Sequence, residues 1–330
     1  MTRLTRQFNK YDLLKCITII LVVIGHITIL YNSTAHPEMN TSFLEILTTF
    51  IYIFHMPLFM AVSGSVYEIG YKKGKYRDFL PFLKNKTYRL IVPYLFVGLF
   101  FLLPTLFIIN NESWSKLFSA FLLAKGNKHL WFLLSLFWIF IFQFFADKLR
   151  IPRGAIFCLA LLFSYLKSFG VGFDFYGLQQ ALHYWPYFIL GIMFESNINL
   201  KQSFATMVIS IVGIIGCMWG QFALKVFCLD AALHIVGPCF FIVLFYVIAT
   251  WLIKYFRENK CLTILIDYSF PIYLFHVPVI FLIHHLFRTV SAWALIPIMF
   301  ILAIMIPIGI AIVLRRLNLQ FLIGERRLSN

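Results

Sequence analysis

The sequence predicts an all-α polytopic membrane protein with about ten transmembrane helices and with its N- and C-termini on the cytoplasmic side. Of the 330 residues, 61% are hydrophobic, 12% are charged and 39 are Phe, a composition outside the range of soluble globular domains. Apolar runs of about twenty residues recur along the whole chain, and each is long enough to cross a hydrocarbon core of roughly 30 Å as a helix. Residues 1–330 are expected to form a single transmembrane domain.

Ten apolar runs define the expected helices. The fifth and sixth are the shortest and carry charged or histidine side chains, so a protein with eight helices is the alternative. The expected spans are residues 12–31, 43–67, 89–109, 130–147, 154–169, 181–195, 204–224, 231–253, 267–287 and 293–314.

The distribution of lysine and arginine supports the ten-helix arrangement. With the N-terminus inside, 21 of the 28 basic residues fall in cytoplasmic segments and 5 in outer segments, as the positive-inside rule requires. The densest basic cluster, residues 71–89, is expected to form the cytoplasmic loop between the second and third helices. The net charge of +15 therefore indicates topology and contact with anionic membrane lipids, and not binding of nucleic acid.

The first helix carries three ionisable residues, Asp12, Lys15 and His26. At about 100° per residue, Lys15 and His26 differ by only about 20° around the helix axis, and they lie about 16 Å apart along it. Such a polar stripe is expected to face the interior of a bundle or a watery cavity. Each residue also has a structural interpretation: a hydrogen bond between helices for His26, snorkelling to headgroups for Lys15, and a helix cap for Asp12.

The second helix contains His55 two residues before Pro57, and its apolar run ends in Ser63 and Gly64. Proline frees a backbone carbonyl that must find a partner in protein or water. A broken helix beside a histidine is typical of the wall of a polar cavity, although a simple kink with His55 as its hydrogen-bond partner is equally compatible.

Other candidate residues lie in later helices. Arg89 stands at the cytoplasmic mouth of the third helix, where an arginine is suited to binding phosphate. His129 and Trp131 stand at the outer start of the fourth helix, a level at which tryptophan is typical of an interfacial belt. In the ninth helix, Tyr273 and His276 lie near mid-membrane in a segment flanked by prolines.

The spacing of the cysteines and glycines predicts no further functional site. The six cysteines form no C-x-x-C pair, so neither a zinc site nor a disulfide framework is predicted. No metal ion and no permanently bound cofactor is expected. Gly216 and Gly220 have G-x-x-x-G spacing, which predicts close helix packing at both positions.

Six stretches in register along the chain resemble the acyltransferase-3 family of multi-pass membrane acyltransferases, which includes bacterial O-acetyltransferases that modify surface glycans. The stretches are "YDLLKCITIILVVIGH", "FHMPLFMAVSG", "RLIVPY", "LWFLLSLF", "YWPYFILGIMF" and "SFPIYLFHVP".

The resemblance implies roles for individual residues. The first helix of the family has a basic residue, ten intervening residues and a histidine regarded as essential for acyl transfer, and Lys15 and His26 occupy these positions. The family more often has arginine where this chain has Lys15. The remaining matches are implied pocket and scaffold residues: Phe54, Pro57, Phe59, Ser63, Gly64, Arg89, Pro93, Trp131, Phe132, Tyr273, Leu274 and His276.

The resemblance also implies the reaction. We expect transfer of an acyl group, with acetyl favoured, from cytoplasmic acyl-CoA to a hydroxyl of an extracytoplasmic or lipid-linked glycan, by a multi-pass protein of the cell inner (cytoplasmic) membrane. His26 would act as a general base or as a transient acyl carrier, with Lys15 and Asp12 completing the catalytic group. The expected substrate- or donor-binding residues are Arg89, His55, Ser63, Trp131, Tyr273 and His276.

Two other functions fit a polar membrane bundle. Broken helices and mid-membrane histidines are also typical of transporters and flippases for glycan or lipid precursors. A non-catalytic subunit of a polysaccharide export system is the second alternative. The dense basic cluster at one mouth and the lack of a visible inverted repeat favour the acyltransferase. The sequence predicts no oligomeric state.

Overall fold

The computed structural model describes residues 9–33, 42–110, 112–125, 127–170, 175–196, 204–224, 227–255 and 260–326, and all the regular structure in these ranges is helical. The helices are α1 Lys10–Ser33, α2 Ser42–Lys72, α3 Phe79–Lys86, α4 Val92–Val97, α5 Leu103–Asn110, α6 Trp114–Leu122, α7 Trp131–Lys148, α8 Arg153–Ser168, α9 Leu178–Ser196, α10 Phe204–Leu224, α11 Phe227–Leu252, α12 Lys260–Leu286 and α13 Ala292–Arg316. Two π-helical segments, Thr87–Ile91 and Gly98–Leu102, join α3, α4 and α5 into one path.

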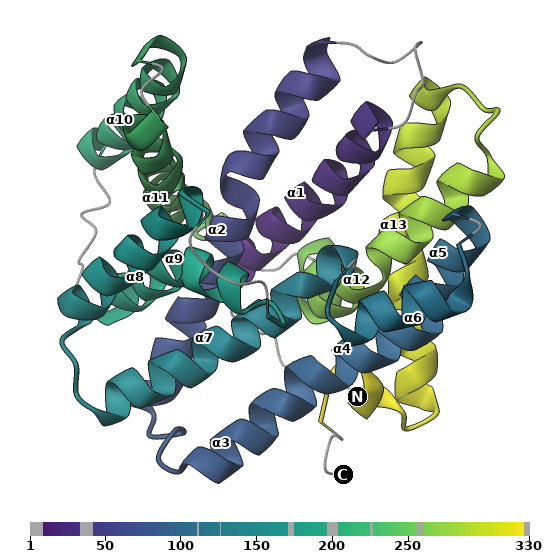
Figure 1. The fold of residues 1–330 in the computed structure, drawn as a ribbon, viewed down its shortest axis with the longest axis horizontal. Coiled ribbons are helices and arrows are strands. Elements are labelled where there is room, and N and C mark those ends of the chain that lie inside the picture. Colours follow the sequence, from purple (N-terminus) through teal and green to yellow (C-terminus); the bar gives the residue numbers. More distant parts are fainter. Residues whose placement is uncertain are drawn as a thin grey trace.

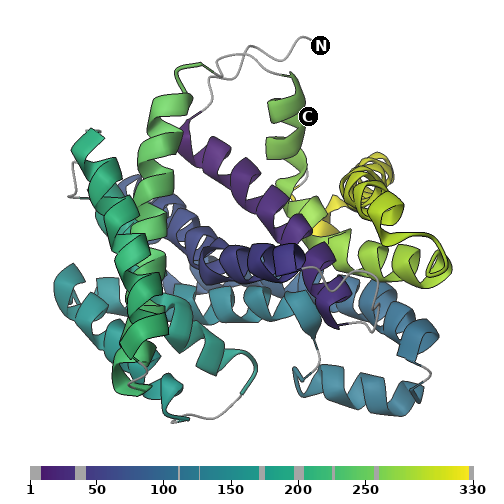
Figure 2. The same ribbon diagram turned by 90° about the horizontal axis from the view of Figure 1, so that it is seen from above.

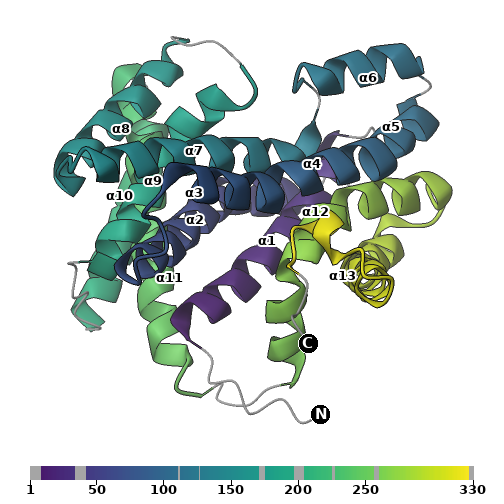
Figure 3. The same cartoon turned by 90° about the horizontal axis from the view of Figure 1, so that it is seen from below.

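Helices α1 and α2 lie in the middle of the molecule. One group, α8 to α11, lies on one side of them, and α12 and α13 lie on the other with α5 and α6 (Figures 1, 2 and 3). The long path of α3, α4 and α5 runs beside α7 across both groups (Figure 3). Side chains that α1 and α2 direct inward can therefore meet residues from both ends of the sequence.

The closest helix contact joins α2 to α9 through two glycines. A Cβ atom on Gly64 would overlap the carbonyl oxygen of Phe188, and a Cβ atom on Gly191 would overlap that of Ala61. Small residues allow helix backbones to approach closely inside membranes, where lipid gives no hydrophobic drive for association. Gly64 is thus a packing residue that holds α9 against α2.

Eight helices of the described residues are long and apolar enough to cross a membrane, with α3 to α5 counted as one span, Phe79–Asn110. Helices α8, of 16 residues, and α9, of 19 residues, fall outside this group. The eight agree with the smaller of the two helix counts that the sequence allows.

Several helix ends that carry basic residues lie together on one side of the molecule. We call this side the basic end. Arg153 pairs there with Asp147 and Glu68. The Tyr11 hydroxyl donates to Glu195, whose backbone carbonyl accepts from Lys72 Nζ at 2.6 Å. The ends of α2, α7 and α9 and the starts of α1 and α8 therefore meet, as alternating spans require.

Two expectations from the sequence are wrong in detail. Residues 71–89 are not a loop, because α2 continues to Lys72 and α3 begins at Phe79. Lysine and arginine keep their charged groups in water while their stems lie along a helix, so a basic cluster does not mark a helix end.

A Cβ atom on Gly216 meets nothing within 4 Å, whereas one on Gly213 would overlap the ring of Phe240. Gly213 thus packs closely against α11, whereas Gly216 does not.

Candidate active site

Four histidines from four separate segments converge inside the bundle. They are His26 on α1, His55 on α2, His129 in the 3-10 turn before α7, and His276 on α12. The ring centroid of His276 lies 5.0 Å from that of His26 and 5.1 Å from that of His129, and the centroids of His26 and His129 are 6.3 Å apart. His55 contacts the group through Tyr52, at 4.7 Å between ring centroids.

Backbone carbonyls determine which nitrogen of two histidines carries the proton. His55 Nδ1 lies 2.8 Å from the Ile51 oxygen, and His276 Nδ1 lies 2.8 Å from the Tyr273 oxygen and 3.0 Å from that of Ile272. A carbonyl oxygen can only accept, so Nδ1 donates in both rings. In the neutral imidazole, the Nε2 atoms of His55 and His276 therefore keep a lone pair.

A proline on α12 determines the role of His129. Pro278 has no N–H, so the carbonyl of Leu274, four residues earlier, loses its helical donor. His129 Nε2 lies 3.0 Å from this oxygen and donates to it, while the Tyr273 hydroxyl donates to the His129 carbonyl at 2.5 Å. One hydrogen bond thus orients the ring of His129 and another fixes its backbone, and its Nδ1 keeps a lone pair.

Two nitrogens of the group are buried without a hydrogen-bond partner among the described residues, His129 Nδ1 and His276 Nε2. His26 is partly exposed, and its ring makes no hydrogen bond to any residue in the described ranges. Native proteins satisfy most buried polar groups, so an unpaired group calls for an explanation such as a catalytic role. Three lone-pair nitrogens thus surround an imidazole whose own hydrogen bonds are available to a substrate.

A cavity of about 90 Å³ adjoins this group. His26, His55 and His129 line it together with the rings of Tyr52, Trp131, Tyr184 and Tyr273. Trp131 stacks on Tyr184, with ring centroids 5.2 Å apart. Aromatic walls exclude water, and the histidines supply its polar contacts, a combination typical of small-molecule sites.

The structure brings together only part of the site that the sequence predicted. Four of the predicted residues line the cavity: His26, His55, Trp131 and Tyr273. His276 does not line it, but its ring contacts that of His26. The other four predicted residues line neither this cavity nor the larger one described below. Lys15 pairs with Asp12 at 3.9 Å, Ser63 donates to the Phe59 carbonyl at 2.9 Å within α2, and Arg89 is exposed at the basic end.

One histidine and two tyrosines that line the cavity were not predicted as site residues from the sequence. His129 was noted only for its position at the outer start of the fourth helix, and Tyr52 and Tyr184 were not singled out. The signal for His129 lies in Pro278, because a carbonyl freed inside an apolar helix requires a donor from elsewhere.

Among the described residues, which include all four of these histidines, no group of three or more His, Cys, Asp or Glu side chains is arranged to hold a metal ion. One nitrogen each of His55, His129 and His276 faces a backbone carbonyl. The arrangement is suited to proton transfer by neutral imidazole.

Comparison with known proteins identifies the family. A family model described as an acyltransferase domain, that of the acyltransferase-3 family, matches residues 8–316. No curated protein and no solved structure matches the chain. The match covers every helix from α1 to α13 and all four histidines. The chain therefore belongs to the acyltransferase-3 family and is a membrane acyltransferase.

Proposed function

We propose that the protein transfers an acetyl group from acetyl-CoA, bound at the basic end, to a hydroxyl of a glycan or lipid-linked sugar reached from the opposite side of the cell inner membrane. The observation that carries the proposal is His26, an imidazole that has no hydrogen-bond partner in the described part of the chain and lines a cavity next to three further histidines.

The basic end suits the donor. Exposed cations gather there, on the last turn of α2, the following loop, α3 and the adjoining π-helical segment: Lys72, Lys73, Lys75, Lys84 and Arg89. Coenzyme A carries several phosphate charges, which lysine and arginine bind through charge-assisted hydrogen bonds. The positive-inside rule assigns this end to the cytoplasm, where acetyl-CoA is made.

The chemistry proposed for His26 is general base catalysis. Its lone-pair nitrogen accepts the proton of the sugar hydroxyl as the oxygen attacks the thioester carbonyl. The C–O bond of the new ester forms, the C–S bond breaks, and the proton passes to the departing thiolate, so that coenzyme A leaves as a thiol. His26 is an imidazolium for one step of this reaction. During that step, the lone pair of His276 Nε2, on the neighbouring ring, is available to accept a hydrogen bond from it.

The experiment is an assay of purified protein with acetyl-CoA labelled in the acetyl group. Wild-type protein should release coenzyme A thiol and label a sugar acceptor. His26→Ala should lower the transfer rate at least about hundredfold, the lower range for loss of a general base, with unchanged insertion and melting temperature. A wild-type protein that never consumes acetyl-CoA would overturn the proposal.

A matched histidine variant is the control. His285, in the last turn of α12, lines neither cavity, so His285→Ala should transfer at the wild-type rate. Equal losses in His26→Ala and His285→Ala would remove the special role of His26.

A further inference from the structure

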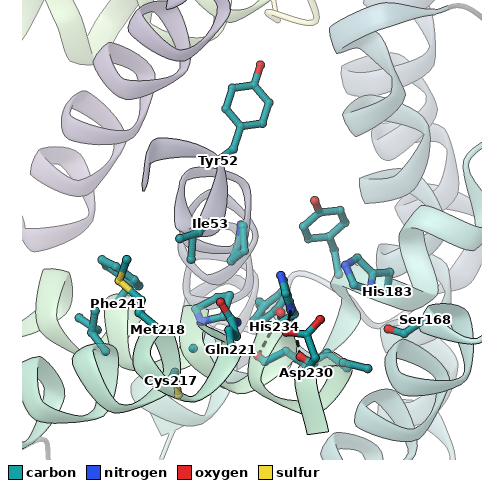
Figure 4. A pocket seen from close by; sticks show the side chains of 18 of the residues that line it. Tyr52, Ile53, Ser168, His183, Cys217, Met218, Gln221, Asp230, His234 and Phe241 are labelled. Carbon is teal, nitrogen blue, oxygen red and sulfur yellow. Dashed lines mark hydrogen bonds and ion pairs between the residues drawn. The ribbon is translucent and has the colours of Figure 1, made fainter. Parts of the chain in front are cut away.

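A second and larger cavity, of about 400 Å³, lies between α2 and the group of helices α8 to α11. Its volume falls in the range of about 300–1,000 Å³ that small-molecule sites occupy. Figure 4 shows Ser168 and His183 on one side of the space, with Gln221, Asp230 and His234 below. The donor chemistry proposed above makes no use of this cavity.

The wall of this cavity carries both charged and neutral polar groups. Asp230 contributes a carboxylate, 3.4 Å from His234, and the two side chains are 38% and 61% exposed. His183 Nδ1 lies 2.9 Å from the Ser164 hydroxyl, and Lys167 and Gln221 add an ammonium and an amide. Carboxylate, amide and imidazole groups together supply both donors and acceptors, which a lipid tail would not use and a ring with several hydroxyls would.

The two cavities share an aromatic wall. Tyr52 and Tyr184 line both, and Tyr184 stacks on Trp131 inside the histidine cavity. The flat apolar face of a sugar ring packs on such aromatic faces while its hydroxyls point to polar side chains. A ring held in the larger cavity therefore lies next to the group that contains His26.

The location fits a route from the side opposite the donor. Lys167 is the second-last residue of α8, and Asp230 lies in the first turn of α11. The start of α8 and the end of α9 carry Arg153 and Glu195 at the basic end. The polar wall thus stands at the far end of these helices, away from the exposed cations.

We propose that the larger cavity is the acceptor site and binds one glycosyl unit, whose reacting hydroxyl passes between Tyr52 and Tyr184 to His26. This inference rests on the proposed function, since it names the subsite for the acceptor of that reaction, and the bonds formed and broken are those given above.

The first test separates the two substrates kinetically. Full-length protein in nanodiscs receives acetyl-CoA and a panel of methyl and octyl glycosides of glucose, galactose, N-acetylglucosamine and glucuronic acid. Asp230→Asn should raise KM for the accepted glycosides about tenfold, the loss of one hydrogen bond to a charged group, and leave KM for acetyl-CoA unchanged. Ala231→Trp, which fills the cavity from a buried position, should stop transfer to the glycosides and leave the binding of acetyl-CoA unchanged.

Two variants outside the cavity are the controls. Glu112, just before α6, pairs with Lys116 four residues later, the same spacing as Asp230 and His234, so Glu112→Gln tests the loss of a similar carboxylate. Gly216→Trp adds the same bulk to α10 where a side chain meets open space. Both should keep the wild-type KM for the glycoside. Unchanged glycoside KM in Asp230→Asn and Ala231→Trp would overturn the acceptor site.

The second test reads binding without catalysis, so that it stays informative if the proposed reaction fails. Ser168→Cys is combined with His26→Ala and with serine at the exposed Cys158, Cys228 and Cys261. A bound glycoside should slow maleimide labelling of the new thiol at least about threefold. Protection by octyl glycosides alone indicates a lipid-linked acceptor, and protection by methyl glycosides as well indicates a free one. No protection by any member of the panel overturns the inference.

Discussion

The basic end pairs its buried carboxylates with a cation, whereas the histidine cavity leaves two titratable nitrogens without a hydrogen bond to any described residue. At the basic end, Asp147 accepts from Arg153, from the Tyr67 hydroxyl at 2.8 Å and from Gln143 Nε2 at 2.9 Å. Even the buried Lys86 ammonium lies 3.3 Å from the centroid of the Phe140 ring.

The histidine cavity leaves its polar groups incomplete. His129 Nδ1 and His276 Nε2 are buried without a partner in the described part of the chain. A buried polar group without a hydrogen bond costs about 1–3 kcal/mol.

The difference distinguishes polar residues that hold the fold from those that we propose serve the reaction. The ion pairs at the basic end join the ends of α2, α7 and the start of α8. The unpaired nitrogens in the cavity cost stability, which is expected where a substrate or a proton completes them.

The largest effect on stability should come from breaking the buried ion pairs. Arg153→Met leaves Asp147 and Glu68 as buried carboxylates without their cation, and removing one partner of a buried pair costs about 3–5 kcal/mol. Denaturant unfolding in detergent should show this loss, while transfer per folded molecule stays unchanged.

An exposed pair provides the control. Lys116→Met removes a pair with Glu112 on the surface of α6, where such pairs contribute about 0.5 kcal/mol. The triple change of Arg153→Met, Asp147→Asn and Glu68→Gln should recover much of the stability. If Arg153→Met is as stable as Lys116→Met, the buried ion pairs at the basic end contribute no more to stability than an exposed pair.

The next effect should be on activity alone. His276→Leu removes an unpaired nitrogen and keeps an apolar group of similar volume, so the free energy of unfolding should change by no more than about 1 kcal/mol. The rate of transfer should fall about hundredfold, because the imidazolium of His26 loses its neighbour. Unfolding and acetyl transfer measured on one preparation separate the two effects. A destabilised but fully active protein would assign His276 to packing.

A smaller effect should follow from restoring one backbone donor. Pro278→Ala returns an N–H to α12, which then competes with His129 Nε2 for the Leu274 carbonyl. The ring of His129 loses its orientation, and transfer should fall about tenfold, equivalent to one hydrogen bond, without loss of stability. Pro307→Ala in α13, away from both cavities, should transfer normally. Equal rates in the two variants would mean that His129 needs no such support.

The smallest effect should come from Lys15→Arg. Lys15 pairs with Asp12 and has a side chain 33% exposed, and either cation can keep a partly exposed pair worth about 1 kcal/mol or less. Transfer should change less than threefold. Steady-state kinetics with acetyl-CoA check this, and a tenfold change in KM for acetyl-CoA would place residue 15 in the donor site.

Much of the helical architecture could be predicted from the sequence, because membrane spans depend on hydrophobic length, a local property. The eight apolar helices correspond to runs visible in the sequence. The boundaries of α2 and α3 could not be predicted, since lysines and arginines extend from a helix into water without ending it. Gly216 shows a similar limit, because spacing cannot tell which glycine faces a neighbouring helix.

Part of the site was also predictable. His26, His55 and His276 were singled out because an ionisable group in an apolar run is costly and suggests a use. The sequence did not predict Tyr52, His129 and Tyr184 as site residues, since their neighbours in the sequence are typical of interfacial or packing residues.

By itself, the sequence determined the membrane class, the family and the histidine on α1, because hydropathy, charge distribution and ordered motifs are written along the chain. Only the tertiary structure decided which residues share the cavity. His129 and Leu274, 145 residues apart, meet because α7 and α12 both contact Phe59 of α2, and Pro278 on α12 leaves a carbonyl for the histidine just before α7. The physical reason is that a backbone group without water must find its partner through space, wherever in the chain that partner lies.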